Sequence, residues 1–218
     1  MATRCRSRKR WSNARCWHLR EAALFADRIV LASANPQHAT LLASAGFDCE
    51  LMPVQVEETL DIEETPDGYA RRVALLKALD ATQRAEGRLV IAAKKVVLVG
   101  GDMLGTPRDG DDTRRMLRLL SGREHDVITA VCAGRDSRNQ TRTDRTRVQF
   151  APLTDEEVDW YVESGEPVRR AGAYAIDGLA ARFITRIDGS YSNAMGLPIT
   201  VVYQLCRHFL STAQHLTS

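Results

Sequence analysis

Two adjacent lysines, Lys94 and Lys95, interrupt an otherwise apolar stretch from Leu89 to Val99. Apolar runs of this kind predict buried strands, and successive strand residues point to opposite faces. Only one of the two lysines can therefore face a cleft. An inward lysine needs a carboxylate partner, because an unpaired buried charge is costly. It would hold an anionic group of a ligand, or attack a carbonyl if burial lowers its pKa. The alternative is that both lysines mark a surface-exposed strand end.

Three other side chains have types and positions suited to a ligand site. Ser33 follows an apolar run and precedes a predicted helix, where its hydroxyl and nearby amides can face an anion. Glu58 follows Glu57 in a loop, and Lys77 lies one residue past an apolar helix position. Each also has an ordinary explanation: a helix cap, a solvated acidic pair, and a lysine that extends along apolar surface to water.

The elements that must position these residues alternate between strand and helix, which predicts an α/β fold. The expected strands are 28–32, 47–53, 89–93, 96–99, 125–133, 143–150 and 183–187. The expected helices are 37–45, one opened by Thr65-Pro66, 111–120, one opened by the capping box 154–157, and 198–210. In the helix after Pro66, the predicted buried stripe consists of Tyr69, Val73, Leu76 and Leu79.

The charge is unevenly distributed along the chain. Residues 1–20 carry seven basic side chains and no acid, which leaves 23 bases against 28 acids in the other 198 residues. We therefore divide the chain into a basic extension (1–27), a main domain (28–211) and a short tail (212–218). The extension is interpreted as a solvated segment, an organelle transit peptide, or a contact for an anionic partner or a neighbouring subunit.

Several classes of protein are not expected. No apolar run approaches the length of a membrane span, and no signal-peptide core precedes Ser33. The five cysteines are odd in number and widely spaced, and the histidines show no metal-ligand spacing. Reduced thiols, a cytoplasmic location and no structural zinc site are therefore predicted, with no specific nucleic-acid partner.

Ordered motifs over most of the chain resemble those of the Maf family of nucleotide pyrophosphatases. The matching segments are 29–36 (IVLASANP), 56–59 (VEET), 69–78 (YARRVALLKA), 119–129 (LLSGREHDVIT), 150–161, 165–167, 171–174 (AGAY) and 189–198 (GSYSNAMGLP). The resemblance implies an elongated mixed sheet with flanking helices, like that of inosine triphosphate pyrophosphatases, and two lobes around a cleft. It also implies cleavage of nucleoside triphosphates to monophosphate and pyrophosphate with a divalent metal, and a homodimer.

The chain departs from the family pattern at several positions of the cleft. Where the family has S-P-R-R, Gln37 and His38 replace both arginines. Lys94 stands where the family has the acidic residue of G-A-D-T, Thr106 replaces a lysine, Asp177 replaces a glutamine and Leu75 replaces an arginine. A lysine cannot bind Mg²⁺ in place of an aspartate, since its ammonium has no lone pair and repels the ion.

Three functions follow from this pattern. The first is a Maf-like cleft protein repurposed for a different, metal-independent reaction of a small molecule, either nucleotide-like or another anionic metabolite. The alternatives are a nucleoside triphosphate pyrophosphatase with a rearranged site, and a catalytically inactive nucleotide-binding or regulatory protein. No cofactor is expected, apart from Mg²⁺ or Mn²⁺ if the family activity survives. The predicted catalytic residues are Lys94, Glu58 and Asp177. The predicted ligand-binding residues are Ser33, Asn35, Gln37, His38, Lys77, Thr106, Ser190, Tyr191, Ser192 and Asn193.

Overall fold

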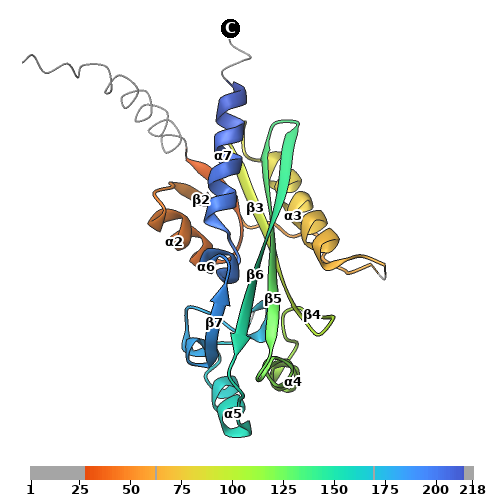
Figure 1. The fold of residues 1–218 in the computed structure, drawn as a ribbon. Coiled ribbons are helices and arrows are strands. Elements are labelled where there is room, and N and C mark those ends of the chain that lie inside the picture. The colour runs from red at the N-terminus through yellow and green to blue at the C-terminus, as the bar shows by residue number, and fades with distance from the viewer. Residues whose placement is uncertain (1–27, 62, 169, 214–218) are drawn as a thin grey trace, which may run out of the picture.

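The computed structural model describes residues 28–61, 63–168 and 170–213. The basic extension 1–27 and residues 214–218 of the tail lie outside these ranges. Within them the chain forms a mixed seven-stranded sheet with flanking helices (Figure 1), which confirms the predicted α/β class. The strands are β1 (Ile29–Ala32), β2 (Cys49–Leu51), β3 (Val90–Val99), β4 (Asp102–Leu104), β5 (Glu124–Arg135), β6 (Arg138–Phe150) and β7 (Ile184–Asp188). The helices are α2 (Pro36–Ser44), α3 (Pro66–Thr82), α4 (Gly110–Leu120), α5 (Asp155–Glu163), η1 (Ala171–Ala173), η2 (Leu179–Phe183), α6 (Tyr191–Met195) and α7 (Ile199–Ala213).

β3 is a central strand of the sheet and pairs with β1, β4 and β5. The strand order is β2-β1-β3-β5-β6-β7, and β4 also pairs with β3. β1 pairs in parallel with β2 and β3, whereas the remaining pairs are antiparallel. The molecule is elongated, with α2, α3 and α7 around one half and α4 and α5 at the other end (Figure 1). β3 and the β5–β6 hairpin extend through both halves and join them.

The expected break in β3 at its two lysines is absent. Instead of two runs, 89–93 and 96–99, the structure has one strand of ten residues. Lys94 lies opposite Ala130 of β5 and Lys95 lies opposite Thr129, so the ladder continues through both residues. The prediction of a break was wrong because backbone pairing with β5 holds the strand whatever the side chains are.

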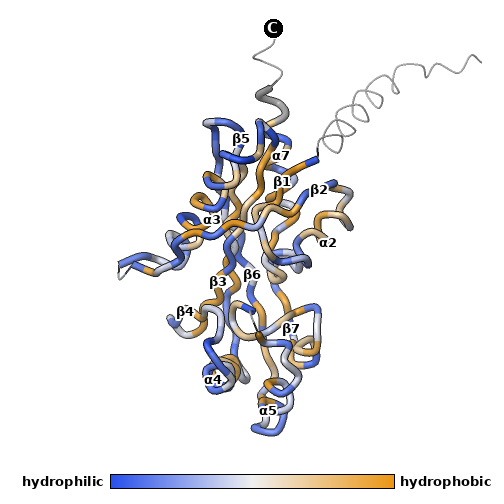
Figure 2. The backbone as a smooth tube through the Cα atoms, turned by 180° about the vertical axis from the view of Figure 1, so that it is seen from behind, coloured by the Kyte–Doolittle hydropathy of each residue, from blue (hydrophilic) through white to orange (hydrophobic). Residues whose placement is uncertain are grey.

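Three apolar clusters form the core. One lies between α3 and the sheet, a second lies between α2, α7 and the opposite face, and a third fills the half that contains α4 and α5. Figure 2 shows apolar residues along β1 and β3 and hydrophilic ones in the loop before α3. None of the helices in the described ranges combines the length and apolarity that a membrane span requires.

Local signals set most of the helix starts. Thr65 caps α3 by accepting from the Gly68 amide, with Pro66 in its first turn, and Thr154 opens α5 with the predicted capping box. The buried stripe of α3 differs from the expected one at Leu76, which is only half-buried, and at Leu79, which is 43% exposed. Small residues form most of the stripe instead: Ala70, Ala74, Ala78 and Ala81 pack closely on the sheet.

His125 at the start of β5 is a buried titratable group of the core. Its side chain is 3% exposed, its Nε2 lies 2.9 Å from the Tyr174 hydroxyl, and its ring packs edge-on against Phe150. Burial, with a smaller contribution from the charge of Lys95, lowers the pKa of His125 to about 4. The folded protein therefore holds this imidazole neutral where an unfolded chain would protonate it.

This difference predicts a loss of stability in mild acid. Between pH 6.5 and about 4 the unfolded chain binds a proton at His125 that the folded chain does not, so the free energy of unfolding falls as pH falls. Urea unfolding at pH 7 and pH 4.5 should show that His125→Gln loses about 2 kcal/mol less than the original protein over this interval. Equal losses in the two proteins would contradict the assignment.

Candidate anion-binding site in the middle of the sheet

Glu58 lies between two lysines. Its Oε1 is 2.5 Å from Lys77 Nζ and its Oε2 is 2.5 Å from Lys94 Nζ. The lysine side chains are 19% and 18% exposed, so both charges are largely withdrawn from water. Lys94 Nζ also lies 5.1 Å from the ring centroid of Tyr69, within the range of a cation–π contact.

Three different elements bring this triad together. Lys94 comes from the middle of β3 and Lys77 from α3, which packs on that face of the sheet. Glu58 comes from the extended segment before α3. Its backbone carbonyl accepts a 2.8 Å hydrogen bond from the Tyr69 hydroxyl, and Arg72 donates to the carbonyl of Thr59 at 2.8 Å. The loop acid is thus fixed by the helix that supplies one of its lysines.

The electrostatics of the triad suit anion binding better than base catalysis. Burial alone would raise the pKa of Glu58, but the hydrogen bonds and charges of Lys77 and Lys94 outweigh it and lower that pKa. Glu58 is therefore ionised at neutral pH, and each of its oxygens is bound to an ammonium group. Two cations share one carboxylate, so the group keeps an excess positive charge for a ligand.

The residues present do not fit a divalent metal. In the described ranges, no three His, Cys, Asp or Glu side chains gather closely enough to hold a metal ion. Both oxygens of Glu58 are already paired with ammonium groups, those of Lys77 and Lys94. Mg²⁺ and Mn²⁺ need oxygen ligands, and an ammonium group repels them.

Lys95 points to the opposite face of β3. Its Nζ lies 5.8 Å from the ring centroid of Tyr174. Burial and the charge of Arg170 lower the pKa of Lys95 to about 8, against the opposing effect of Asp177. The continuous strand carries Lys95 into the protein, so the two lysines do not mark an exposed strand end.

Asp177 belongs to the surroundings of Lys95. Gln37 Nε2 donates to its carboxylate at 3.0 Å, and Arg170 donates to the Gln37 side-chain oxygen. Of the two carboxylates predicted to be catalytic, Glu58 pairs with Lys94, whereas Asp177 bonds to Gln37. Sequence reasoning missed Arg170, although a basic pair at 169–170 directly precedes the matching AGAY segment.

Ser33 and His38 form a pair at the carboxyl end of β1. Ser33 Oγ lies 3.1 Å from His38 Nδ1 and also accepts a hydrogen bond from the Asn35 amide at 3.1 Å. Asn35 caps α2 by accepting from the Gln37 amide. Burial first, and then the charges of Lys95, Lys77 and Arg170, lower the pKa of His38 to about 4. Lys77 thus pairs with Glu58 and also acts on His38, which connects the groups on the two faces.

Most of the 190–193 segment has a structural role. Ser190 caps α6, and its hydroxyl lies 3.0 Å from that of Ser192. Asn193 is fully buried and donates to the Val127 carbonyl and the Thr146 hydroxyl, so it ties α6 to β5 and β6 and does not reach a ligand-accessible surface. Tyr191 is 50% exposed. Thr106, another predicted ligand residue, lies on an exposed loop after β4.

Gly196 allows the close packing of His38 and Lys95. It has φ of +105°, and a Cβ there would lie 3.2 Å from His38 Nε2 and 3.3 Å from Lys95 Cδ. A side chain at this position would be strained and would displace both groups. The glycine therefore serves the site as well as the turn after α6.

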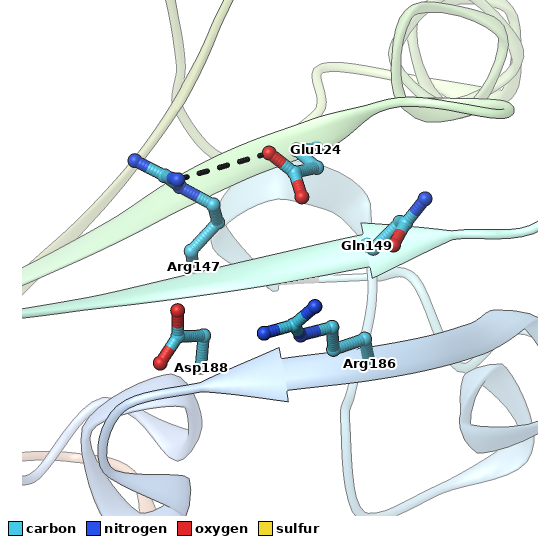
Figure 3. A pocket seen from close by; sticks show the side chains of 5 residues that line it. All are labelled: Glu124, Arg147, Gln149, Arg186 and Asp188. Atoms are coloured by element: carbon cyan, nitrogen blue, oxygen red, sulfur yellow. Dashed lines mark ion pairs between the residues drawn. The ribbon is translucent and has the colours of Figure 1, made fainter.

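A hollow on the outer face of β5, β6 and β7 is a weaker candidate. It has a volume of about 130 Å³ and is lined by Glu124, Arg147, Gln149, Arg186 and Asp188 (Figure 3). Arg147 and Glu124 form an ion pair at 3.8 Å between two half-exposed side chains. Cations and carboxylates alternate there, so the hollow has no excess charge for an ion.

Comparison with known proteins gives consistent matches. The family model described as Maf-like protein matches residues 28–209. A dTTP/UTP pyrophosphatase from Anaeromyxobacter dehalogenans is 45% identical over 186 residues, covering 84% of this chain and 94% of that protein. One from Aliivibrio fischeri is 38% identical and covers 84% and 98%. Among solved structures, the Ham1 protein of Staphylococcus aureus matches with a TM-score of 0.49 at 14% identity, covering 86% of this chain and 100% of that one.

The arrangement around His38 predicts an unusual titration. Imidazole resonances followed by NMR should give a pKa near 4 for His38 instead of the ordinary 6.5. Lys95→Met should raise that pKa because it removes a neighbouring positive charge. Lys94→Met is the matched control and should change it less, since Lys94 is not among the charges that act on His38. An ordinary pKa in the original protein would show that the ring is not held in this environment.

Proposed function

Because this chain belongs to the Maf-like protein family, we propose that it cleaves a nucleoside triphosphate to the monophosphate and pyrophosphate, without a metal. The expectation of an unrelated small-molecule reaction has less support, since the relatives at about 40% identity are called dTTP/UTP pyrophosphatases. Those names favour a pyrimidine nucleotide such as dTTP or UTP as the substrate.

The observation that carries the proposal is the triad in which Lys77 and Lys94 each pair with one oxygen of Glu58. Cleavage of a triphosphate needs positive charge against the phosphate oxygens, and lysines and arginines supply it as metal ions do. Lys77, Lys94, Lys95 and Arg170 face two carboxylates, Glu58 and Asp177, so positive charge is in excess. Pairing with Glu58 holds the two ammonium groups in position before the ligand binds, which lowers the entropic cost of binding.

Binding without cleavage is the second candidate. It is favoured by the state of Glu58, whose oxygens are both engaged and whose pKa is lowered, so that the triad contains no free base for water. The two candidates share the nucleotide and differ in whether pyrophosphate is released. A predicted homodimer and a cytoplasmic location remain predictions, and a monomer mass by sedimentation velocity at micromolar concentration would refute the dimer.

A pyrophosphate-release assay with dTTP and UTP tests the activity. Release should be the same with Mg²⁺ and with EDTA. Lys94→Met should weaken nucleotide affinity by about 10- to 100-fold, which corresponds to one charge-assisted hydrogen bond. Arg118→Met is a matched control, because it removes one positive charge from an exposed ion pair between α4 and α5.

The outcomes separate the candidates. Nucleotide binding measured by calorimetry with no pyrophosphate release would establish the binding protein. Pyrophosphate release that requires Mg²⁺ in the original protein would overturn the proposal that lysine ammonium groups take the role of a metal ion. Absence of both binding and release would overturn the proposed function itself.

The variant Lys94→Asp gives an independent test of the metal argument. It places a second carboxylate beside Glu58 and frees one Glu58 oxygen from its lysine. We expect pyrophosphate release by this variant to depend on Mg²⁺ or Mn²⁺. Unchanged activity in EDTA would show that position 94 does not determine the use of metal.

A further inference from the structure

The proposed function leaves the Ser33–His38 pair without a role. Ser33 directly follows β1, whose four residues are all buried, and its amide donates to the Leu31 carbonyl at 2.8 Å. His38 lies in the first turn of α2. Both residues are half-buried, so their side chains are fixed by the fold and remain reachable by a ligand.

The hydrogen bonds around the pair determine where its protons lie. The His38 ring bonds to the backbone carbonyl of Met195, and its Nε2 lies beside Gly196, the next residue. A carbonyl only accepts, so assigning this bond to Nε2 places the ring proton there and leaves Nδ1 to accept. The Asn35 amide already donates to Ser33 Oγ. The hydroxyl proton therefore points to His38 Nδ1 at 3.1 Å.

This is the arrangement of an activated nucleophile: a hydroxyl bonded to a base whose far side is oriented by a third group. Here the Met195 carbonyl takes the place of a carboxylate behind the histidine. A helix cap alone does not require it, because Asn35 already caps α2. The pair lies beside Lys95, Arg170 and Lys77, the cations that we assign to the phosphates.

We propose that Ser33 is a nucleophile and His38 its general base, and that the pair attacks the α-phosphorus of the nucleotide. This inference rests on the proposed function for its substrate. The Ser33 Oγ–P bond forms as the bond from the α-phosphorus to the bridging oxygen breaks, and pyrophosphate leaves with the electron pair. The Ser33 proton passes to His38 Nδ1 and then to the leaving pyrophosphate.

Hydrolysis of the nucleotidyl-serine completes the reaction. Water adds to the phosphorus, His38 takes the proton of the water, and this proton is returned to Ser33 Oγ as the Oγ–P bond breaks. The balance is one triphosphate and one water consumed, and one monophosphate and one pyrophosphate formed. No metal takes part in either step.

The surrounding cations adjust the base. In the free protein they help to keep His38 neutral, with its pKa lowered to about 4. A polyphosphate bound to Lys95, Arg170 and Lys77 would offset their charge and raise the pKa of His38, which strengthens the base when substrate is present. On the elements packed against the ring, these three cations and the Met195 carbonyl are the groups that act on it.

An alkyl fluorophosphonate tests the nucleophile without depending on nucleotide chemistry. The full-length protein is incubated with the probe, and the adduct is located by peptide mass spectrometry. We expect one adduct, on Ser33, that is absent in Ser33→Ala. His38→Gln should slow labelling by at least about 100-fold, the usual contribution of a general base. As a control, Ser44→Ala removes an exposed hydroxyl of α2, the helix that contains His38, and should be labelled on Ser33 at the original rate.

The pH profile distinguishes a base from a merely structural histidine. Labelling should continue at pH 5, since His38 remains unprotonated there. No adduct on Ser33, or equal labelling rates in the original protein and His38→Gln, would overturn the inference. If Ser33→Ala does not fold, as judged by thermal unfolding, His38→Gln still decides the question because it leaves Ser33 in place.

Nucleotide labelled with ³²P at the α-phosphate separates this inference from the proposed function. Radioactivity that stays on the original protein but not on Ser33→Ala would support both the nucleophile and the pyrophosphatase activity. Pyrophosphate release at an unchanged rate in Ser33→Ala would overturn the nucleophile and leave the pyrophosphatase. Fluorophosphonate labelling without nucleotide cleavage would keep the nucleophile and overturn its attack on a nucleotide.

Discussion

Two ammonium groups in the middle of β3, the strand that joins both halves of the sheet, determine the character of this site. The ladder between β3 and β5 continues through Lys94 and Lys95, so their backbones have no freedom to turn the side chains to water. Alternation along the strand sends one lysine to each face. Each face must then accommodate a positive charge, and the two faces do so differently. Glu58 neutralises Lys94 in part, whereas Lys95 is left beside Arg170 with a lowered pKa.

Under the proposed function, fixed cations would take the role of an exchangeable metal ion at this site. A metal ion can be lost and regained, and it activates water as well as binding phosphate. Lysines bind phosphate but do not activate water, so the base must come from elsewhere. Glu58 is unsuited to supply it, because Lys77 and Lys94 pair with both of its oxygens and lower its pKa. Two imidazoles near these cations are held neutral, and of the two His38 is only half-buried and has its Nδ1 toward the Ser33 hydroxyl, whereas His125 is buried against Tyr174.

The sequence predicted the local features of this fold well and its long-range features less well. Caps at Thr65 and Thr154 depend on residues a few positions apart, and both were predicted correctly. The continuity of β3 depends on pairing with β5, more than thirty residues away in the sequence. The hydrophobic pattern therefore predicted a break at the two charged residues. The neighbours of Lys95 come from α2, the 170–177 segment and Gly196, and no spacing in the sequence indicates that they meet. Leu76 and Leu79 were wrongly predicted to be buried because the buried stripe of α3 is built largely from alanines.

Gln37 and His38, which stand where the resemblance implies two arginines, suit the lysines of β3. An arginine at position 38 would lie beside Lys95 and Lys77, the charges that now act on the imidazole, and like charges at short distance are unfavourable in a partly buried site. A neutral histidine removes that repulsion and still offers a hydrogen-bonding nitrogen. Gln37 in turn bridges Arg170 and Asp177, accepting from one and donating to the other. A guanidinium group at position 37 could not accept a hydrogen bond from Arg170. The groups present at 37, 38, 94 and 95 therefore suit one another: the cations lie on β3, and the side chains of α2 beside them are hydrogen-bonding groups without a positive charge.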